Sequence, residues 1–395
     1  MRAAVCSILC AAVCACGSAA GSGSTGGGPP TYPADAGSRP GDSGGGSPDG
    51  GYGESPSPDG GSGPVAENVD PWKELVIVDS SVVLDARASN ENDGAWSFRR
   101  LMERLGPGVQ VESWLRTFRQ ASLNRFPLED RADVEDLIAS WPRRDGVPDL
   151  AQAPFRLLAV VSRIDLTTSA NGEARLVYGL YDPATGAPRK MTVGFEYRLP
   201  ALGTGNDRAE WARRWHALGK LPYGEGFNVA LQQLTDAFAQ GASLSQLRTN
   251  EQQFGQFWQL RQWVLNGGVL RLATTPQTPD QSLNGTVLLS QFILDNADAL
   301  RAGTAVVPPD LQGGASHAIG AWVFKNDPRI DEPLRHAFAK QTCNGCHAQE
   351  TNSVQGFFHI SPFKPVAGNG QDRVSDFLKG DELKRRIAWL QELLR

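Results

Sequence analysis

The sequence predicts an α+β domain with a mainly antiparallel sheet over residues 65–310, followed by a small all-α domain over residues 311–395. The first observation behind this expectation is a change of hydrophobic period, from helical spacing before residue 150 to strand-like runs after it. The second is that residues 311–395 hold helical patterns on either side of a loop rich in glycine and proline. The length after the N-terminal segment, roughly 330 residues, suits one large domain or two.

Three helices are expected ahead of the sheet. Apolar residues recur at helical spacing in the stretches 98–105, 111–118 and 134–141. Gly106 follows the first stretch and Pro142 the third, and both residue types end helices because of their backbone preferences.

The strands come next. The run FRLLAVVSRIDL, residues 155–166, is nearly continuous in apolar residues, as in a buried strand. EARLVYGLY, residues 173–181, follows after a turn, and residues 191–197 alternate as in a half-buried antiparallel strand. Asn266-Gly267-Gly268 marks a hairpin. Further helices are expected over 207–219, 227–238 and 289–300.

This first domain contains no motif that indicates an enzyme. It has no glycine-rich phosphate loop, no G-x-S-x-G and no H-E-x-x-H. Its one histidine, His216, lies on an expected helix and is expected to be a structural, hydrogen-bonded residue. Asp165 and Glu196 could form a pair of carboxylates, but ion pairs with Arg163 or Arg198 are the favoured interpretation.

The N-terminus predicts export. Residues 1–15 carry one basic residue and an apolar run that is too short to span a membrane. Val13-Cys14-Ala15-Cys16 resembles the lipobox of bacterial lipoproteins, which implies cleavage before Cys16 and lipidation of its thiol; an ordinary cleaved signal peptide is the alternative. The residue after Cys16 is Gly17 and not an aspartate, which in lipoproteins implies residence in the outer rather than the inner membrane. Residues 16–64, rich in Gly, Ser and Pro, are expected to form a flexible tether.

The motif that carries chemistry is Cys343-Asn344-Gly345-Cys346-His347. Two thiols at this spacing can each form a thioether to a vinyl group of haem, and His347 can then bind the iron as the proximal ligand. Export agrees with this interpretation, because covalent haem attachment takes place outside the cytoplasm. Zinc bound by Cys343, Cys346, His347 and His359 is one alternative. A disulfide or redox dithiol is the other, although no thioredoxin-like βαβ pattern surrounds the motif.

A helix leading into C-x-x-C-H, an irregular loop and a final amphipathic helix together resemble the class I c-type cytochrome domain. The resemblance covers residues 311–395 and depends mainly on Cys343, Cys346 and His347. The final helix is expected to begin at Asp381 as its N-cap and to place one apolar stripe on Leu383, Ile387, Leu390 and Leu394. The resemblance implies a single covalent haem c.

The whole chain also resembles, less specifically, a group of uncharacterised lipoproteins from myxobacteria-like Gram-negative bacteria. The shared features are the tether, the stretches WSFRRLME, FRLLAVVSRIDL and SQLRTNE, and a terminal block of the form CNGCHxxET. This resemblance implies the same order of domains, and it implies no activity for residues 65–310.

The second axial ligand of the iron is not given by the motif. Class I cytochromes usually place a methionine downstream, but no methionine of this chain follows His347. His336 lies eleven residues before His347, which is about 16 Å along a straight helix and too far to bind the same iron.

His359 can reach the iron. The twelve residues after His347 suffice to pass the haem edge, since an extended chain covers about 3.3 Å per residue. Phe357, Phe358 and Ile360 flank it with apolar surface that suits a haem crevice. A surface or supporting role for His359, His317 as the ligand in its place, and an open sixth site are the alternatives.

These features predict a membrane-tethered, exported monohaem c-type cytochrome that transfers electrons to an unknown redox partner or senses redox state. The net charge of −5 gives no indication of nucleic-acid binding. One alternative is a non-catalytic binding lipoprotein in which the C-x-x-C-H region is structural. The other is a peroxidase-like haem enzyme with an open sixth site.

Overall fold

The computed structural model describes residues 67–395, except residues 167–168, 256, 318–320, 325–326, 352–357 and 365 and the side chains of residues 348 and 349. The expected signal peptide of residues 1–15, the expected lipidation site Cys16 and the expected tether of residues 16–64 lie outside the described residues. Glu67–Arg395 belong to one compact unit.

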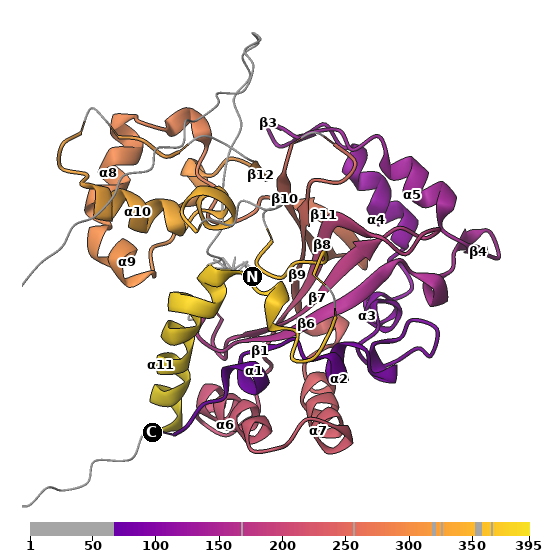
Figure 1. Cartoon of the computed structure of the whole chain (residues 1–395). Helices are drawn as coiled ribbons and strands as arrows, with labels where there is room; N and C mark the ends of the chain where they lie inside the picture. Colours follow the sequence, from indigo (N-terminus) through magenta and orange to yellow (C-terminus); the bar gives the residue numbers. More distant parts are fainter. Residues whose placement is uncertain are drawn as a thin grey trace, which may run out of the picture. The chain divides into compact units, whose positions relative to one another are not determined.

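An antiparallel eight-stranded sheet is the centre of this unit (Figure 1). Its strands are β1 (Val76–Ile77), β6 (Phe155–Arg163), β7 (Glu173–Tyr181), β8 (Pro188–Arg198), β9 (Leu244–Glu251), β10 (Gln259–Asn266), β11 (Val269–Ala273) and β12 (Ser316–His317). The order is β1-β6-β7-β8-β9-β10-β11, and β12 pairs with β10. Two small hairpins join β2 (Ser122–Leu123) to β3 (Phe126–Pro127) and β4 (Arg143–Arg144) to β5 (Val147–Pro148).

The helices are α1 (Pro71–Glu74), α2 (Ser80–Val83), α3 (Phe98–Arg104), α4 (Val111–Arg116), α5 (Val134–Ser140), α6 (Asp207–Gly219), α7 (Glu225–Asp236), α8 (Val287–Asp295), α9 (Ala297–Ala302), α10 (Glu332–Lys340) and α11 (Leu383–Leu394). Two short π-helical turns, Gly345–Gln349 and Leu378–Glu382, follow α10 and precede α11. None of the helices described is long and apolar enough to cross a membrane.

The expected mixture of helices with a mainly antiparallel sheet is confirmed. The expected hairpin joins β10 to β11, and Gly267 and Gly268 adopt the positive φ angles, 60° and 75°, that its turn requires. Strand β9 was not expected. The helix expected over residues 289–300 is two helices, α8 and α9, because Asn296 leaves the helical conformation between them.

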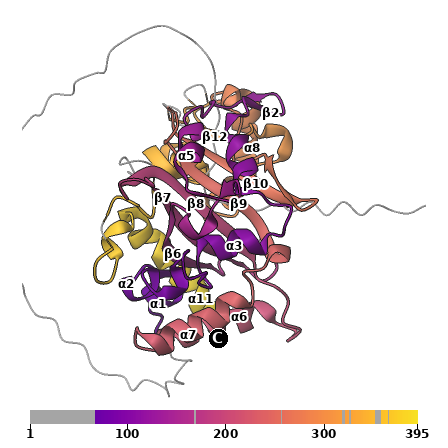
Figure 2. The same ribbon diagram turned by 90° about the vertical axis from the view of Figure 1, so that its right-hand side faces the viewer.

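Helix α3 lies over one face of the sheet (Figure 2). Aromatic side chains of α3 and α4 pack on this face. Phe98 of α3 stacks on Phe155 of β6 with ring centroids 4.3 Å apart. It also meets Tyr178 of β7 and Phe195 of β8 edge to face. These residues are fully buried, so this face forms the main apolar core.

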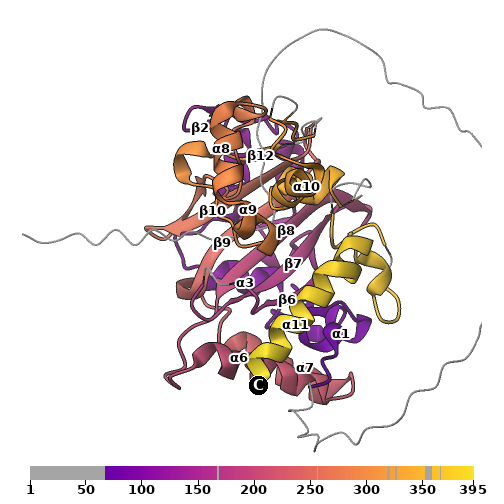
Figure 3. The same cartoon turned by 90° about the vertical axis from the view of Figure 1, so that its left-hand side faces the viewer.

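The other face lies beneath α10, α11 and the segments next to them (Figure 3). Val177 of β7 is paired with Gly194 of β8, and Gly194 with Arg248 of β9. Residues paired directly across antiparallel strands lie on the same face of the sheet. Val177, Gly194 and Arg248 therefore all lie on the face that the C-terminal segments cover.

Residues 311–395 divide their packing between two cores. Leu334 and Phe338 of α10 pack with residues of α8 and α9. Leu383 and Leu390 of α11 join the main core, and α11 packs against α6. The expected boundary at residue 310 therefore lies within a packed core.

The expected start of the final helix lies close to the observed one. The chain leaves the helical conformation at Gly380, with φ −85° and ψ −116°, and α11 starts at Leu383, without the side-chain cap that was expected. The carboxylate of Asp381 is exposed and lies 3.3 Å from Nζ of Lys384.

Candidate functional site

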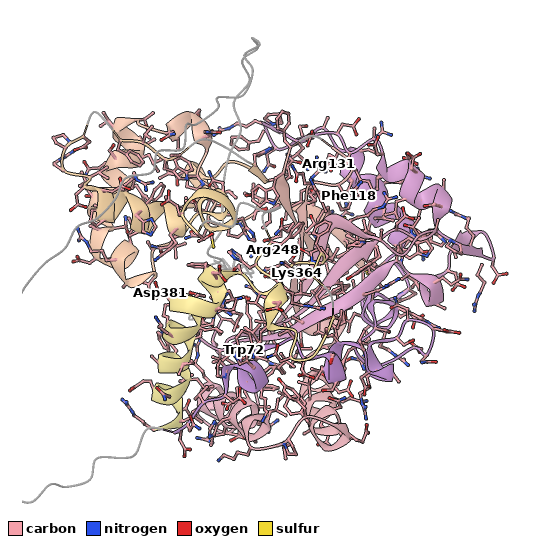
Figure 4. All side chains as sticks on the ribbon, in the orientation of Figure 1. Trp72, Phe118, Arg131, Arg248, Lys364 and Asp381 are labelled. Carbon is pink, nitrogen blue, oxygen red and sulfur yellow. The ribbon has the colours of Figure 1, made fainter. Side chains whose placement is uncertain are left out.

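A pocket lies between the sheet and the C-terminal segments. Its empty volume, with the open mouth included, is about 970 Å³. Strands β6 to β10 form one wall. The segments around Cys346, His359 and Leu378 form the opposite wall together with α11. Arg248 of β9 lies on the pocket side of the sheet, next to these segments (Figure 4).

The motif is held firmly on its side of the pocket. Asp331 caps α10 by accepting a hydrogen bond from the Leu334 amide at 2.9 Å, and the chain then turns into the motif. Trp322 donates to the hydroxyl of Thr342 at 3.0 Å, just before Cys343. Gly345 is required here because a Cβ atom would collide with the carbonyl oxygen of Ala339.

The two cysteines are both buried thiols, and only one of them lines the pocket. Cys346 is part of the pocket wall. Cys343 packs in a small apolar cluster with Cys346, Trp258 and Leu260. The structure therefore does not form the disulfide that was one alternative for this motif.

His347 and His359 lie side by side in the pocket wall. Their ring centroids are 4.5 Å apart. Nε2 of His359 lies 3.4 Å from Sγ of Cys346, and Nδ1 of His359 lies 2.9 Å from the hydroxyl of Ser375. Burial, with a further contribution from His347, holds the pKa of His359 well below its usual value, so its ring is neutral. The expectation that His359 approaches the motif agrees with this geometry.

His347 contacts the sheet through Asn250 of β9. Nδ2 of Asn250 lies 3.2 Å from Nδ1 of His347, and Oδ1 of Asn250 accepts from the indole of Trp258. The indole N–H of Trp258 can only donate, so Asn250 presents its oxygen to Trp258 and its N–H to Nδ1 of His347. Nδ1 then accepts a hydrogen bond, and a neutral His347 carries its proton on Nε2. Binding of a metal through Nε2 would require the proton to move to Nδ1 and the amide to turn.

The other histidines lie outside the pocket lining. Nδ1 of His336 is 2.5 Å from a carboxylate oxygen of Glu350, so His336 is held away from the site, as helix geometry predicted. His317, the reserve ligand, lies on β12 with Nδ1 2.7 Å from Nε2 of Gln259. Burial and nearby arginines lower the pKa of His317 to about 4.

His216 has the structural role that was expected for it. Its Nδ1 lies 2.9 Å from a carboxylate oxygen of Glu74, which is fully buried, and its Nε2 lies 3.3 Å from Glu67. His216 joins α6 to the first turn of the described chain, and it is not among the residues that line the pocket.

Charged side chains from the sheet line the same pocket. Asp165 pairs with Arg163 at 2.9 Å, which confirms one expected ion pair. Glu196 pairs with Arg175 and Arg248, at 3.3 and 3.5 Å. Burial alone would raise the pKa of Glu196, but these two arginines lower it, so Glu196 is ionised.

The sequence did not reveal this wall of the pocket. The sequence feature that could have revealed this wall is the presence of charged residues within otherwise apolar strands, as at Arg163, Arg175 and Glu196. A buried charge is costly unless it is paired or binds a ligand, so such positions mark a site rather than a core.

The four-residue zinc site does not form. Among the described residues, no three or more His, Cys, Asp or Glu side chains are grouped so that they could hold a metal ion. Zinc bound by protein ligands alone needs four of them in tetrahedral geometry.

Comparison of the chain with models of protein families, with curated proteins and with solved structures finds no match. The resemblance to c-type cytochromes therefore depends on Cys343, Cys346 and His347 alone. The pocket beside the motif is a separate observation, because it comes from the structure and not from the sequence pattern.

Proposed function

We propose that the chain carries one haem c, attached through Cys343 and Cys346 with His347 as an iron ligand, and that it transfers electrons or senses redox state outside the cytoplasm. The observation that supports this most is the meeting of Cys346, His347 and His359 in one pocket. His359 lies twelve residues after His347, outside the motif, and a chance C-x-x-C-H motif has no need of such a partner.

The pocket suits the group in chemistry. Val161 and Val177 from the sheet, with Phe377 opposite, supply apolar surface for a flat aromatic body. Haem would supply a one-electron redox couple, which the ordinary side chains of the chain lack.

His359 is the residue that we assign as the second iron ligand. Ser375 holds its Nδ1, which leaves Nε2 directed at the pocket. A metal bound by two imidazoles keeps each nitrogen about 2 Å away, so the rings of His347 and His359 must part from their present 4.5 Å separation. Two imidazoles leave no open site for catalysis, which favours electron transfer over peroxidase-like chemistry.

Thiol chemistry is a second candidate function, favoured by one contact. Cys346, His359 and Ser375 are in contact in the order of a nucleophile, its base and an orienting group. However, the lowered pKa of His359 makes its ring a weak base, so it activates the thiol of Cys346 poorly. This candidate therefore ranks below haem.

The site of action is also a proposal. Cleavage before Cys16 and lipidation of its thiol would anchor the chain to the outer membrane, with residues 16–64 as the tether. Support comes from the lipobox-like sequence alone. Replacing Cys16 by Ser should release the protein into the soluble periplasmic fraction. A wild type that is already soluble would contradict the anchor and leave the haem proposal intact.

The haem proposal is tested on the full chain, made in the periplasm of a host that attaches haem. The wild type should stain for haem after denaturing electrophoresis and gain the mass of one haem. Replacing Cys343 and Cys346 together by Ala should remove both signals. His359→Ala should convert the ferric spectrum to high-spin and admit cyanide, whereas the control His336→Ala should change nothing.

Two outcomes would redirect the proposal. A colourless wild type, in a host where other c-type cytochromes mature, would favour the non-catalytic binding lipoprotein or the thiol candidate. A wild type that is already high-spin, with no effect of His359→Ala, would favour the open sixth site and its peroxidase-like chemistry.

A further inference from the structure

Arg386 of α11 has a buried donor atom without a partner in the described part of the chain. Only 6% of the residue is exposed, and it lines the pocket. Its Nε and Nη2 atoms both lie 2.8 Å from Oε1 of Glu382, one turn earlier on the chain. Its Nη1 atom has no hydrogen-bond partner among the residues that the structure describes.

An unsatisfied donor of this kind is costly. A buried polar group without a partner costs about 1 to 3 kcal/mol, and a charged one costs more. Burial lowers the pKa of Arg386, and the nearby charge of Arg163 lowers it further. The lowered pKa means that this environment disfavours the charged form of the guanidinium group. The neighbouring Arg163 is satisfied differently, by two contacts with Asp165 at 2.9 and 3.0 Å.

The charges around Arg386 favour an anion in the pocket. The lining contains four arginines and two glutamates, namely Arg163, Arg175, Arg248, Arg386, Glu196 and Glu382. The carboxylates of Asp165 and Glu173, which pair with Arg163 and Arg175, do not line it. A ligand in the pocket therefore meets more guanidinium than carboxylate groups.

We propose that Nη1 of Arg386 binds a carboxylate group of the molecule that occupies this pocket. The inference builds on the proposed function, under which the carboxylate is a propionate of the attached haem. A small free carboxylate that enters beside the haem has the same chemistry. Guanidinium groups bind carboxylates through charge-assisted hydrogen bonds, and such a bond would satisfy the one unused donor of Arg386.

Arg385 provides a matched control. It is the neighbouring residue on the same helix and carries the same charge. Its side chain is 41% exposed, pairs with Asp165 and Glu382 at 2.8 and 3.0 Å, and does not line the pocket. Arg385→Gln therefore removes the same charge at nearly the same place without removing the donor.

The first measurement is the reduction potential of the haem-loaded full chain as a function of pH. Arg386→Gln should keep the haem but lower the potential, because a positive charge near the iron favours the reduced state. The pH at which a propionate alters the potential should rise, because the carboxylate loses its cationic partner. Arg385→Gln should show a clearly smaller shift. Equal shifts, or none with Arg386→Gln, would overturn the assignment to a propionate.

The second measurement does not require covalent attachment. The chain with Cys343 and Cys346 replaced by Ala is titrated with protoporphyrin IX and with its dimethyl ester, which lacks the charges. The free acid should bind about tenfold more tightly than the ester, the factor that corresponds to about 1.4 kcal/mol. Arg386→Gln should remove this preference and Arg385→Gln should keep it. A preference that survives Arg386→Gln would overturn the proposal.

The third measurement separates the two sources of the carboxylate. Benzoate is added to the full chain, with or without haem, and thermal unfolding is followed. A rise in Tm of the haem-loaded chain that Arg386→Gln abolishes would assign the donor to a small free carboxylate. A wild type without haem would end the haem proposal, and the benzoate and porphyrin titrations would still decide whether Arg386 binds carboxylates. If benzoate has no effect and the free porphyrin acid binds no more tightly than its ester, the proposal that Arg386 binds a carboxylate is refuted.

Discussion

The two faces of the central sheet are built from alternate residues of the same strands, yet they differ in what they contain. On one face, Tyr178 and Phe195 pack against Phe98 of α3 and are fully buried. On the other, the adjacent residues Val177, Gly194 and Glu196 border a pocket. Side chains alternate along a strand, so one segment of sequence can supply core and site together. The comparison teaches that the sheet is a wall of the site as well as its scaffold.

The faces also differ in how polar groups are satisfied. On the aromatic face, the hydroxyl of Tyr178 donates to the carbonyl of Trp96 at 2.8 Å, so this buried hydroxyl has its hydrogen-bond partner within the core. On the pocket face, Glu196 and Arg248 form part of a charged network beside an open space. Buried ion pairs add little net stability, so this network contributes less to the fold than the aromatic packing does.

The largest expected effect contrasts a truncation on each face. Phe98→Ala should lower the free energy of unfolding by about 3 to 5 kcal/mol, because it leaves a cavity among fully buried rings. Val177→Ala removes methyl groups that border the pocket and should cost about 1 kcal/mol or less. Urea unfolding of both variants measures the difference. Equal losses would mean that the pocket face is packed as tightly as the aromatic face.

A smaller effect is expected in acid, at the cover of the pocket face. Burial would raise the pKa of Glu382, but Arg386 and Arg163 lower it to about 2. An acid whose pKa is depressed in the folded state stabilises the fold above its unfolded pKa of 4.5. That contribution, on the order of 2 to 3 kcal/mol, is lost as the pH falls from 4.5 toward 2.

Glu382→Gln should therefore flatten the decline of stability between these pH values, measured by urea unfolding at each pH. Glu392→Gln is the matched control, since this exposed residue of α11 pairs with Arg395 at the end of the chain and does not line the pocket. An unchanged acid profile in Glu382→Gln would show that the ion pairs around Arg386 do not hold α11 over the pocket.

Hydrophobic periodicity was sufficient to predict most of the aromatic face but little of the pocket face. The strands of residues 155–166, 173–181 and 191–197 were found because their apolar residues mark them. Strand β9 reads LSQLRTNE and has too few apolar residues to indicate burial. Its Arg248 is buried because Glu196 and Gln262 bind it from the neighbouring strands, and these pairings follow only from the order β8-β9-β10.

The site was partly predictable for a similar reason. Cys346, His347 and His359 were identified from spacing and chain reach, and the structure brings them together. Arg386 had no local signal, since an arginine on an amphipathic helix usually faces water. Its burial depends on where α11 packs, which residues far away in the sequence determine.

The smallest expected effect tests how the two helices over the pocket face begin. Asp331 accepts a hydrogen bond at the start of α10, so Asp331→Ala should cost about 1 kcal/mol in the free energy of unfolding. Asp381, which the sequence predicted as a cap, lies exposed after the kink at Gly380 (Figure 4), and its carboxylate contacts Lys384. Asp381→Ala should change stability by less than about 0.5 kcal/mol. If Asp381→Ala costs as much as Asp331→Ala, then the carboxylate of Asp381 caps the final helix in solution, and the kink at Gly380 is the boundary at which that helix begins.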